Sequence, residues 1–372
     1  MKFRRLSLIF FLLFSLSCSA QQDFYQLVRA QLGLGNYFEP SNTVFFEQAL
    51  KEEGLLKAVL ATSDRVVRNS QIGAAQSPFL CSDGKIHENI FGPVPEPLKQ
   101  QHFELDSFLP KGSSRPLGAD AAFIDYLLGN SLSSDAVYYL FGSAFEASDS
   151  LDFYKGLALY TANSLEQAVD YFDRVPDTSS YFEKSLFFST VCDAYLGRFQ
   201  QARSRLQSYS GSRQELCQYE LAALSLLEDD AHAYRQAAAN FSYSSYALAD
   251  GEKLFDDIYR SRYESRKKSP ALAAAASAIV PGLGKIYSKC YGEAFASFLC
   301  IGATAAIAAD NWIKRGPQDW RSIVFTTIGA LLYVGNIYGS YVSVGLYNNY
   351  LENAQDNTIV FNIHIPVRSL FP

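Results

Sequence analysis

Two long runs without charge, both in the last quarter of the chain, constrain its fold most strongly. Residues 322–346, "SIVFTTIGALLYVGNIYGSYVSVGL", hold no charged side chain, and residues 293–309, "EAFASFLCIGATAAIAA", hold none after Glu293. A helix needs roughly 20 apolar residues to cross a bilayer, so the second run is long enough and the first is at the short limit. Side chains typical of a membrane interface stand between the runs: Trp312, Lys314, Arg315 and Trp320. The runs predict a transmembrane helical hairpin, and the alternative is a buried hairpin in a soluble core.

The stretch before the first run, "SAIVPGLGKIYSKCYGEAFASFL" (277–299), contains Gly-Lys and could be taken for a phosphate loop. A phosphate loop has the pattern G-x-x-x-x-G-K-[ST] and follows a strand. Ile279 stands where the first Gly is needed, and Ile286 stands where Ser or Thr is needed. The preceding residues 271–280 are alanine-rich, which favours a helix over a strand. A nucleotide site is therefore excluded.

Proline and glycine in this stretch indicate a break between two helices. Pro281 cannot donate a helical hydrogen bond, and Gly282 and Gly284 tolerate a sharp turn. We therefore expect an interfacial or re-entrant helix over 271–287, ahead of a first membrane span at 293–309.

The same residues resemble the opening of a widespread bacterial family of small membrane hairpins. Members often read Ser-Ala-hydrophobic-Pro-Gly-hydrophobic-Gly-Gln-x-Tyr, followed by a basic spacer, a Gly and the first span. Lys285 departs from the usual Gln, and the resemblance covers residues 270–349. It implies an α-helical membrane hairpin and no particular activity. The positions that carry it are Pro281, Gly282, Gly284, Tyr287 and Gly292.

The middle of the chain contains an internal repeat. Residues 156–175 ("GLALYTANSLEQAVDYFDRV") align with 190–209 ("TVCDAYLGRFQQARSRLQSY") at an offset of 34 residues, a period that resembles the tetratricopeptide repeat. Small Ala residues let paired helices approach closely, and neighbouring pairs must stack to bury their apolar faces. The resemblance implies a helical-repeat domain over 119–268, and a generic helical bundle is the alternative. The signature residues are Gly156, Tyr160, Ala168 and Phe172, then Gly197, Phe199, Ala202 and Leu206.

The N-terminus has the form of a secretory signal peptide over residues 1–20. A basic head precedes an apolar stretch over 6–16, and Cys18-Ser19-Ala20 provides a cleavage site after Ala20. Lipidation of Cys18 and an uncleaved anchor are the alternatives, and all three predict export of the segment that follows.

The remaining segments complete the expected organisation of the chain. Residues 21–75 show helical periodicity, 76–118 contain six prolines and are expected to form a loop or linker, and 269–350 are expected to form the membrane domain. A C-terminal tail is expected over 351–372. The predicted fold class is all-α, with tetratricopeptide-like repeats followed by a transmembrane hairpin.

Composition argues against several classes of function. A formal net charge of −6 gives no support for binding nucleic acid. Of six cysteines, five follow Ala20; their odd number and the lack of C-x-x-C spacing favour neither a disulfide framework nor a zinc site. The four histidines are scattered, so no Ser–His–Asp or Cys–His set can be proposed. We expect no enzyme activity, no metal and no cofactor.

These features together predict a membrane-anchored scaffold. The helical repeats would be exported and bind an unknown protein partner, and the hairpin would hold them at the lipid bilayer of the bacterial cell envelope, in the inner membrane. The alternative is a component of an envelope transport or assembly machine in which the membrane hairpin is the active part.

Overall fold

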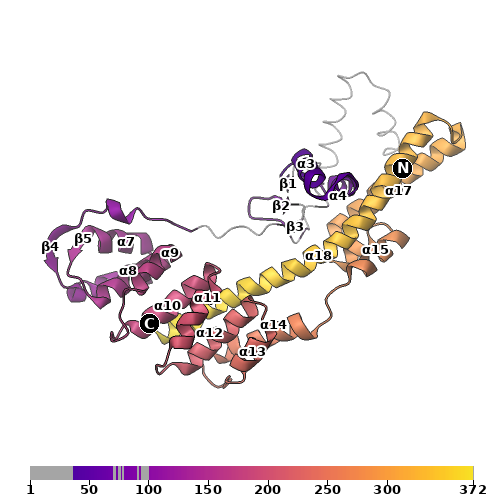
Figure 1. Ribbon diagram of the computed structural model, residues 1–372. Coiled ribbons are helices and arrows are strands. Elements are labelled where there is room, and N and C mark those ends of the chain that lie inside the picture. The colour runs from indigo at the N-terminus through magenta and orange to yellow at the C-terminus, as the bar shows by residue number, and fades with distance from the viewer. Residues whose placement is uncertain are drawn as a thin grey trace. The chain divides into compact units, whose positions relative to one another are not determined.

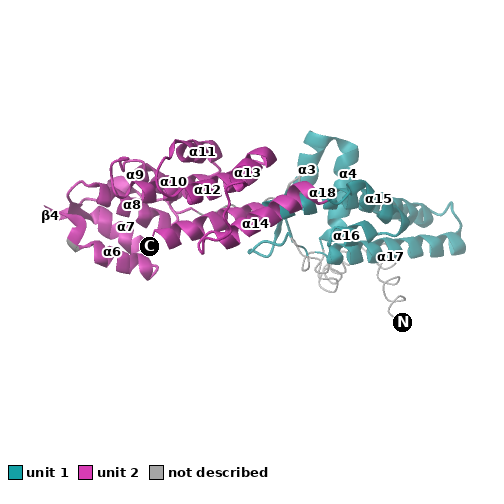
Figure 2. Ribbon diagram, turned by 90° about the horizontal axis from the view of Figure 1, so that it is seen from below, with its two compact units in different colours: residues 1–96, 266–353 teal, residues 97–265, 354–372 magenta. Residues whose placement is uncertain are grey.

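The computed structural model describes residues 37–69, 73, 77, 79–89, 92–93 and 100–371, so the expected signal peptide at 1–20 lies outside the described residues. The chain forms two compact units (Figure 2). Unit 1 comprises residues 1–96 and 266–353, and unit 2 comprises 97–265 and 354–372. Nearly all regular structure in the described residues is helical, which confirms the predicted all-α class for this part of the chain.

The N-terminal half of unit 1 contains a helical hairpin and a small sheet (Figure 1). Gly54, with φ 83°, separates the two helices and has a backbone conformation that favours glycine. Strand β1 pairs in parallel with β2, and β2 pairs antiparallel with β3. The elements are β1 (Phe38–Glu39), α3 (Asn42–Glu53), α4 (Leu55–Arg68), β2 (Ile86–Asn89) and β3 (Gly92–Pro93).

The C-terminal half of unit 1 is made of helices. Ser269 caps the first of them by accepting a hydrogen bond from the Leu272 amide, and Gly316 (φ 88°) ends the third directly after Arg315. Two of these helices, α17 and α18, are long and apolar enough to cross a membrane by length and composition. The elements are α15 (Pro270–Ile279), α16 (Leu283–Tyr287), α17 (Tyr291–Arg315) and α18 (Trp320–Leu370).

Helix α18 is one continuous element of 51 residues. Its residues 320–353 belong to unit 1 and 354–370 belong to unit 2. The segment expected as a C-terminal tail, 351–372, is therefore helical as far as Leu370.

Unit 2 begins with short elements inside the segment expected as a loop. These are η1 (Leu105–Ser107), β4 (Lys111–Arg115) and η2 (Leu117–Ala119), and β4 pairs in parallel with β5 (Ser143–Phe145). Successive helices follow, and a π-helical turn over Arg260–Glu264 ends the series. The helices are α6 (Ala121–Gly129), α7 (Ser133–Gly142), α8 (Asp149–Thr161), α9 (Leu165–Phe172), α10 (Phe182–Tyr195), α11 (Phe199–Ser208), α12 (Gln214–Leu227), α13 (Ala231–Ala238) and α14 (Ala249–Tyr259).

Helices α8–α9 and α10–α11 form two pairs joined by tight turns. Asn163 (φ 60°) and Gly197 (φ 72°) adopt the left-handed conformation in these turns. The second helices begin at Leu165 and Phe199, an offset of 34 residues (199 minus 165) that equals the offset of the sequence alignment. Membership of a particular repeat family stays a prediction.

Small residues allow the helices of these pairs to approach closely. Ala168 and Ala202 are fully buried. A Cβ atom on Gly156 of α8 would lie 2.7 Å from the ring of Phe172 on α9, so glycine is needed for this contact. The Phe172 ring in turn stacks on Phe188 of α10, with centroids 5.8 Å apart.

We expect Ala168→Leu to destabilise unit 2 by about 1–3 kcal/mol, because the added carbons must fit where the packing is already complete. Thermal unfolding followed by circular dichroism measures the change. Asp170→Leu places the same side chain on an exposed position of α9 and should have little effect. Equal stability of the two variants would contradict the close packing at Ala168.

Candidate functional site

Six charged side chains come together in the interior of unit 1. All six are buried, and three are basic and three acidic, so their formal charges balance. Burying a charge is costly unless it is paired and hydrogen-bonded, so this cluster stands out among the charged residues that the structure describes. We call it the ionic cluster. It consists of Asp64, Arg65 and Arg68 from α4, Glu88 from β2, Lys285 from α16 and Glu293 from α17.

Lys285 lies at the centre of the ionic cluster and is fully buried. Its Nζ donates to Asp64 Oδ1 at 2.6 Å and to Ser297 Oγ at 2.9 Å. The lysine of the Gly-Lys dipeptide therefore points into the protein and pairs with a carboxylate. This agrees with the exclusion of a phosphate loop from the sequence.

Arg68 connects the three carboxylates of the ionic cluster. Its Nε donates to Asp64 Oδ2 at 2.8 Å and its Nη2 donates to Glu88 Oε1 at 2.9 Å, while its Nη1 lies 3.8 Å from Glu293 Oε1. Burial alone would lower the pKa of Arg68, but the charges of Glu88, Glu293 and Asp64 outweigh it and hold the pKa above its ordinary value. Arg68 therefore stays charged.

Arg65 is held mainly by aromatic rings and by the backbone. Its guanidinium carbon lies 4.2 Å from the ring centroid of Phe45 and 4.9 Å from that of Phe38, and Nη2 donates to the Pro40 carbonyl at 2.6 Å. Burial lowers its pKa to about 10, although Glu88 opposes the shift. The Nε and Nη1 atoms have no hydrogen-bond partner among the described residues.

Helix α4 packs closely against two glycines of α18. A Cβ atom on Gly335 would collide with Ser63 Oγ, and one on Gly339 would collide with the carboxylate of Asp64. The pattern Gly-x-x-x-Gly is typical of close helix packing in membranes. In this protein, the absence of side chains at Gly335 and Gly339 lets α4 pack against α18, and this packing places Asp64 within hydrogen-bond distance of Lys285.

The expected break between α15 and α16 is present, and its glycines are required by close contacts. Gly282 adopts a left-handed conformation (φ 87°), and a Cβ atom there would collide with the Ala294 carbonyl. A Cβ atom on Gly284 would collide with the Ala273 carbonyl, and the Gly284 amide donates to Ser277 Oγ at 2.9 Å.

The other residues of the hairpin motif surround the same break. Pro281 lies between α15 and α16, and Gly292 is buried in the first turn of α17. The Tyr287 hydroxyl accepts a hydrogen bond from the Ser269 amide at 3.2 Å, and the Tyr287 carbonyl accepts one from Lys268 Nζ. The motif residues thus shape the backbone around Lys285, and the chemistry of the site comes from the ionic cluster.

The polar interior extends along one face of α18. Ser340 pairs with Ser277 at 2.7 Å and Ser343 pairs with Ser288 at 3.1 Å. Asn336 lies one turn before Ser340 and is buried, and neither polar atom of its side chain has a partner among the described residues.

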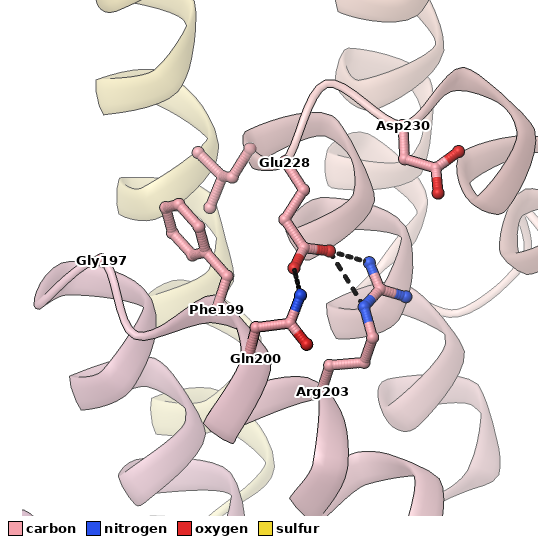
Figure 3. Close-up of a pocket in the computed structure, with 7 residues that line it drawn as sticks. Gly197, Phe199, Gln200, Arg203, Glu228 and Asp230 are labelled. Carbon is pink, nitrogen blue, oxygen red and sulfur yellow. Dashed lines mark hydrogen bonds and ion pairs between the residues drawn. The ribbon is translucent and has the colours of Figure 1, made fainter.

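The repeat-signature residues lie apart from the ionic cluster, in unit 2. Gly197 and Phe199 line an open hollow of about 640 Å³ (Figure 3). An ion pair between Arg203 and Glu228 crosses this hollow, and Glu228 also accepts from Gln200 at 3.5 Å. The remaining lining residues are Leu227 and Asp230. The Asp230 carboxylate caps α13 by accepting hydrogen bonds from the amides of His232 and Ala233, so both acidic side chains of the hollow have structural roles. The other six signature residues, at 156, 160, 168, 172, 202 and 206, lie on α8, α9 and α11.

Metal-binding geometry is absent from the part of the chain that the structure describes. No group of three or more His, Cys, Asp or Glu side chains is placed to hold an ion among these residues. The cysteines at 81, 192, 217, 290 and 300 are all free thiols.

Sequence reasoning missed the contribution of α4 to the ionic cluster. The sequence "SDRVVR" (63–68) places three charged side chains within five residues of α4, and this is the local signal that the sequence offered. Its partner Lys285 is 221 residues away from Asp64, so no local pattern connects them. In comparisons with known proteins, no family model, no curated protein and no solved structure matches the chain.

Proposed function

We propose that this protein is a non-enzymatic, membrane-anchored helical scaffold of the bacterial cell envelope. The hairpin of α17 and α18 inserts into the bilayer and unit 2 binds other proteins. The observation that carries the membrane part is the surface of residues 266–353, which exposes many large apolar side chains while many polar side chains are buried.

Large apolar side chains cover the outside of this segment, whereas many polar side chains lie in its interior beside small apolar ones. In water, contiguous apolar patches of this kind are rare on a monomer, and in lipid they are the favoured surface. The exposed side chains include Leu272, Ile279, Phe295, Phe298, Ile313, Ile323, Ile328, Leu331 and Val334. The buried polar ones include Ser277, Lys285, Ser288, Glu293, Ser297, Thr304, Asn311, Ser322, Asn336, Ser340 and Ser343.

Aromatic and basic side chains mark both ends of the apolar surface. Trp312 and Trp320 are exposed on either side of the turn between α17 and α18. At the other end, Lys268 Nζ lies 4.1 Å from the ring centroid of Tyr347 and 5.3 Å from that of Tyr287. Such belts are typical of membrane–water interfaces, and they delimit the inserted part of the hairpin.

Protein binding by unit 2 is supported by its architecture. Successive helices stack around an aromatic core, an arrangement that creates extended binding surfaces. The first helices of the unit also expose aromatic rings to solvent, namely Phe123, Tyr126 and Tyr138. Exposed aromatic side chains are enriched where proteins bind one another.

We expect alkaline carbonate to leave the full-length protein in the membrane pellet, because the hairpin is held by apolar burial and not by charge. Detergent should then dissolve the pelleted protein, which separates insertion from aggregation. The Cys18→Ala variant should behave in the same way, since the hairpin anchors the chain without a lipid on Cys18. Release of either protein by carbonate would contradict the proposed anchoring.

A second function, in which the hairpin is the active part of an envelope machine, is favoured by the ionic cluster. Ionisable residues within membrane proteins commonly mark ion or proton pathways. The paired variant Asp64→Leu/Lys285→Met removes one positive and one negative charge together. If it folds, keeps partner binding and loses function in the cell, the machine is the better description; retained function favours the scaffold.

A further inference from the structure

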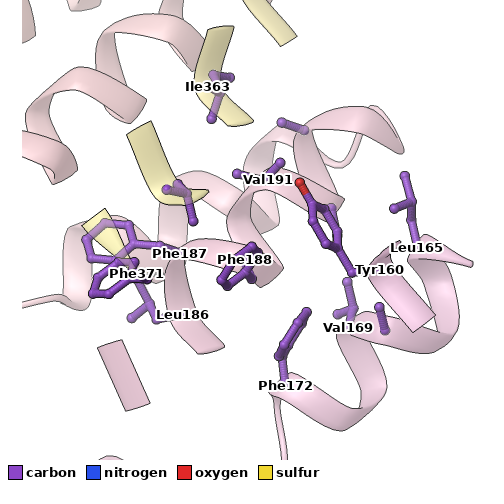
Figure 4. Packing of buried hydrophobic residues seen from close by; sticks show 14 of the residues in the cluster. Tyr160, Leu165, Val169, Phe172, Leu186, Phe187, Phe188, Val191, Ile363 and Phe371 are labelled. Atoms are coloured by element: carbon purple, nitrogen blue, oxygen red, sulfur yellow. The ribbon is translucent and has the colours of Figure 1, made fainter. Parts of the chain in front are cut away.

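The end of α18 packs into unit 2 through a single stripe of apolar side chains. Ile359, Ile363, Val367 and Phe371 are 0%, 1%, 0% and 9% exposed. Residues four apart lie on the same side of a helix, so the first three form one edge of α18, and Phe371 continues it directly after the helix, where its amide still donates to the Val367 carbonyl. Figure 4 shows Ile363 and Phe371 on this edge, close to Phe187 and Val191 of α10.

This segment contacts three helices of unit 2, each of which is the first of a pair. The hydroxyl of Tyr160 on α8 is hydrogen-bonded to His364 Nδ1. The ring of Phe187 on α10 stacks on Phe371, with centroids 5.8 Å apart and planes at 25°. The hydroxyl of Tyr219 on α12 donates to the carbonyl of Asn362 at 3.1 Å. We call the face formed by α8, α10 and α12 the groove.

Polar contacts fix the start of the segment. Arg262 Nη2 donates to Asp356 Oδ1 at 2.6 Å, and Arg262 Nε donates to Gln355 Oε1 at 2.9 Å. On the opposite side of the helix, Phe361 is 58% exposed. The segment therefore has one bound face and one free face, as an amphipathic helix has in a binding groove.

One buried side chain of α12, that of Glu220, has no polar partner on residues 354–371. Glu220 follows Tyr219 on α12 and is fully buried, and neither carboxylate oxygen has a hydrogen-bond partner among the described residues. Burial raises its pKa above the ordinary value. Burial also raises the pKa of Tyr160 and of Tyr219, and the charge of Glu220 adds to both shifts.

We propose that the groove is a helix-binding site, that residues 354–371 occupy it as an intramolecular ligand, and that the protein partner replaces them with an amphipathic helix bearing a basic side chain that pairs with Glu220. This inference rests on the proposed scaffold function and specifies the chemistry of its partner. A buried carboxylate without a partner is destabilising, whereas a charge-assisted hydrogen bond to it is among the stronger polar interactions. A helix with the same apolar stripe and one added Lys or Arg thus binds better than the resident segment.

The first test measures binding of a fluorescent peptide with the sequence of residues 354–371 to the full-length protein in detergent. Ile363→Asp puts a carboxylate on the buried stripe, so the resident segment leaves the groove. We expect this variant to bind the peptide at least about tenfold more tightly than the unchanged protein, because an occupied site lowers apparent affinity by the fraction that is free. Phe361→Asp adds the same charge to the exposed face of the same helix and should bind as the unchanged protein does.

The second test examines Glu220 through a double-mutant cycle that combines one change in the peptide with one change in the protein. Asn362→Lys in the peptide introduces an ammonium at the residue whose backbone carbonyl accepts the hydrogen bond from Tyr219, which directly precedes Glu220. We expect this peptide to bind the Ile363→Asp protein about tenfold more tightly than the parent peptide, as for one charge-assisted hydrogen bond. Adding Glu220→Gln to the protein should abolish the gain.

Two outcomes overturn the groove proposal. Equal peptide affinity for the unchanged protein, the Ile363→Asp variant and the Phe361→Asp variant would show that residues 354–371 do not compete with the peptide. Loss of helical circular dichroism in the Ile363→Asp variant would show that these residues are a fixed part of the core. A lysine gain that survives Glu220→Gln would overturn the role of Glu220. Both tests are made in detergent, so a failure of membrane anchoring in the carbonate experiment leaves their result unchanged.

Discussion

Lys285→Met is expected to destabilise unit 1 by about 3–5 kcal/mol, because it leaves the buried carboxylate of Asp64 without its closest cation. Met keeps most of the apolar length of the side chain, so the loss is mainly electrostatic. The thiol of Cys290 is fully buried in unit 1 and provides the measurement. Its rate of maleimide labelling in detergent, followed by mass spectrometry of the peptide that contains it, should rise steeply in the variant.

The matched control for Lys285→Met is Lys289→Met, which removes a lysine from an exposed position four residues later. Its labelling rate should stay close to that of the unchanged protein. The paired variant Asp64→Leu/Lys285→Met should recover most of the lost stability, because removing both members leaves no unpaired charge. Additive losses from the two single changes would contradict a direct pairing of Asp64 with Lys285.

Val334→Arg is expected to impair insertion of the second span. Val334 is 46% exposed on α18, and an arginine near the centre of a spanning helix costs about 2.5–3.5 kcal/mol on insertion scales. The neighbouring Gly335 is unsuitable for this test, since any side chain there also collides with Ser63. The fraction of protein that resists carbonate extraction measures the effect.

Gln318→Arg introduces the same side chain in the turn between α17 and α18, where it is exposed. It should cost little, because the arginine lies beside Trp320 at the expected interface. If the two arginine variants resist carbonate equally well, residues 322–346 do not cross a membrane.

Local sequence patterns were sufficient to locate the long helices. The two uncharged runs fall within α17 and α18, and Pro281 with Gly282 stands at the break between α15 and α16. The 34-residue offset likewise matches the starts of α9 and α11. These features depend on residues close in sequence, where periodicity, proline and glycine act directly on the backbone.

The ionic cluster could not be predicted in this way. Charged side chains close together on one helix usually indicate a face exposed to water, and α4 carries three of them, Asp64, Arg65 and Arg68. They are buried in unit 1, where α4 packs against Gly335 and Gly339 of α18. The C-terminal segment was missed for another reason. The spacing of Ile359, Ile363, Val367 and Phe371 indicates an amphipathic helix, but the sequence does not show which surface covers its apolar edge.

The separation of Asp64 from Lys285 in the sequence has a consequence for folding during synthesis. Residues 97–265 of unit 2 are encoded between the two parts of unit 1, so α4 leaves the ribosome long before Lys285 is made. At about 5–20 residues per second, the separation of 221 residues takes roughly 10–45 s to synthesise. During this interval Asp64 lacks its partner Lys285, and a chain interrupted before Lys285 never acquires it. Assembly of the complete ionic cluster, and with it the folding of unit 1, therefore waits until the C-terminal part of the chain has been made.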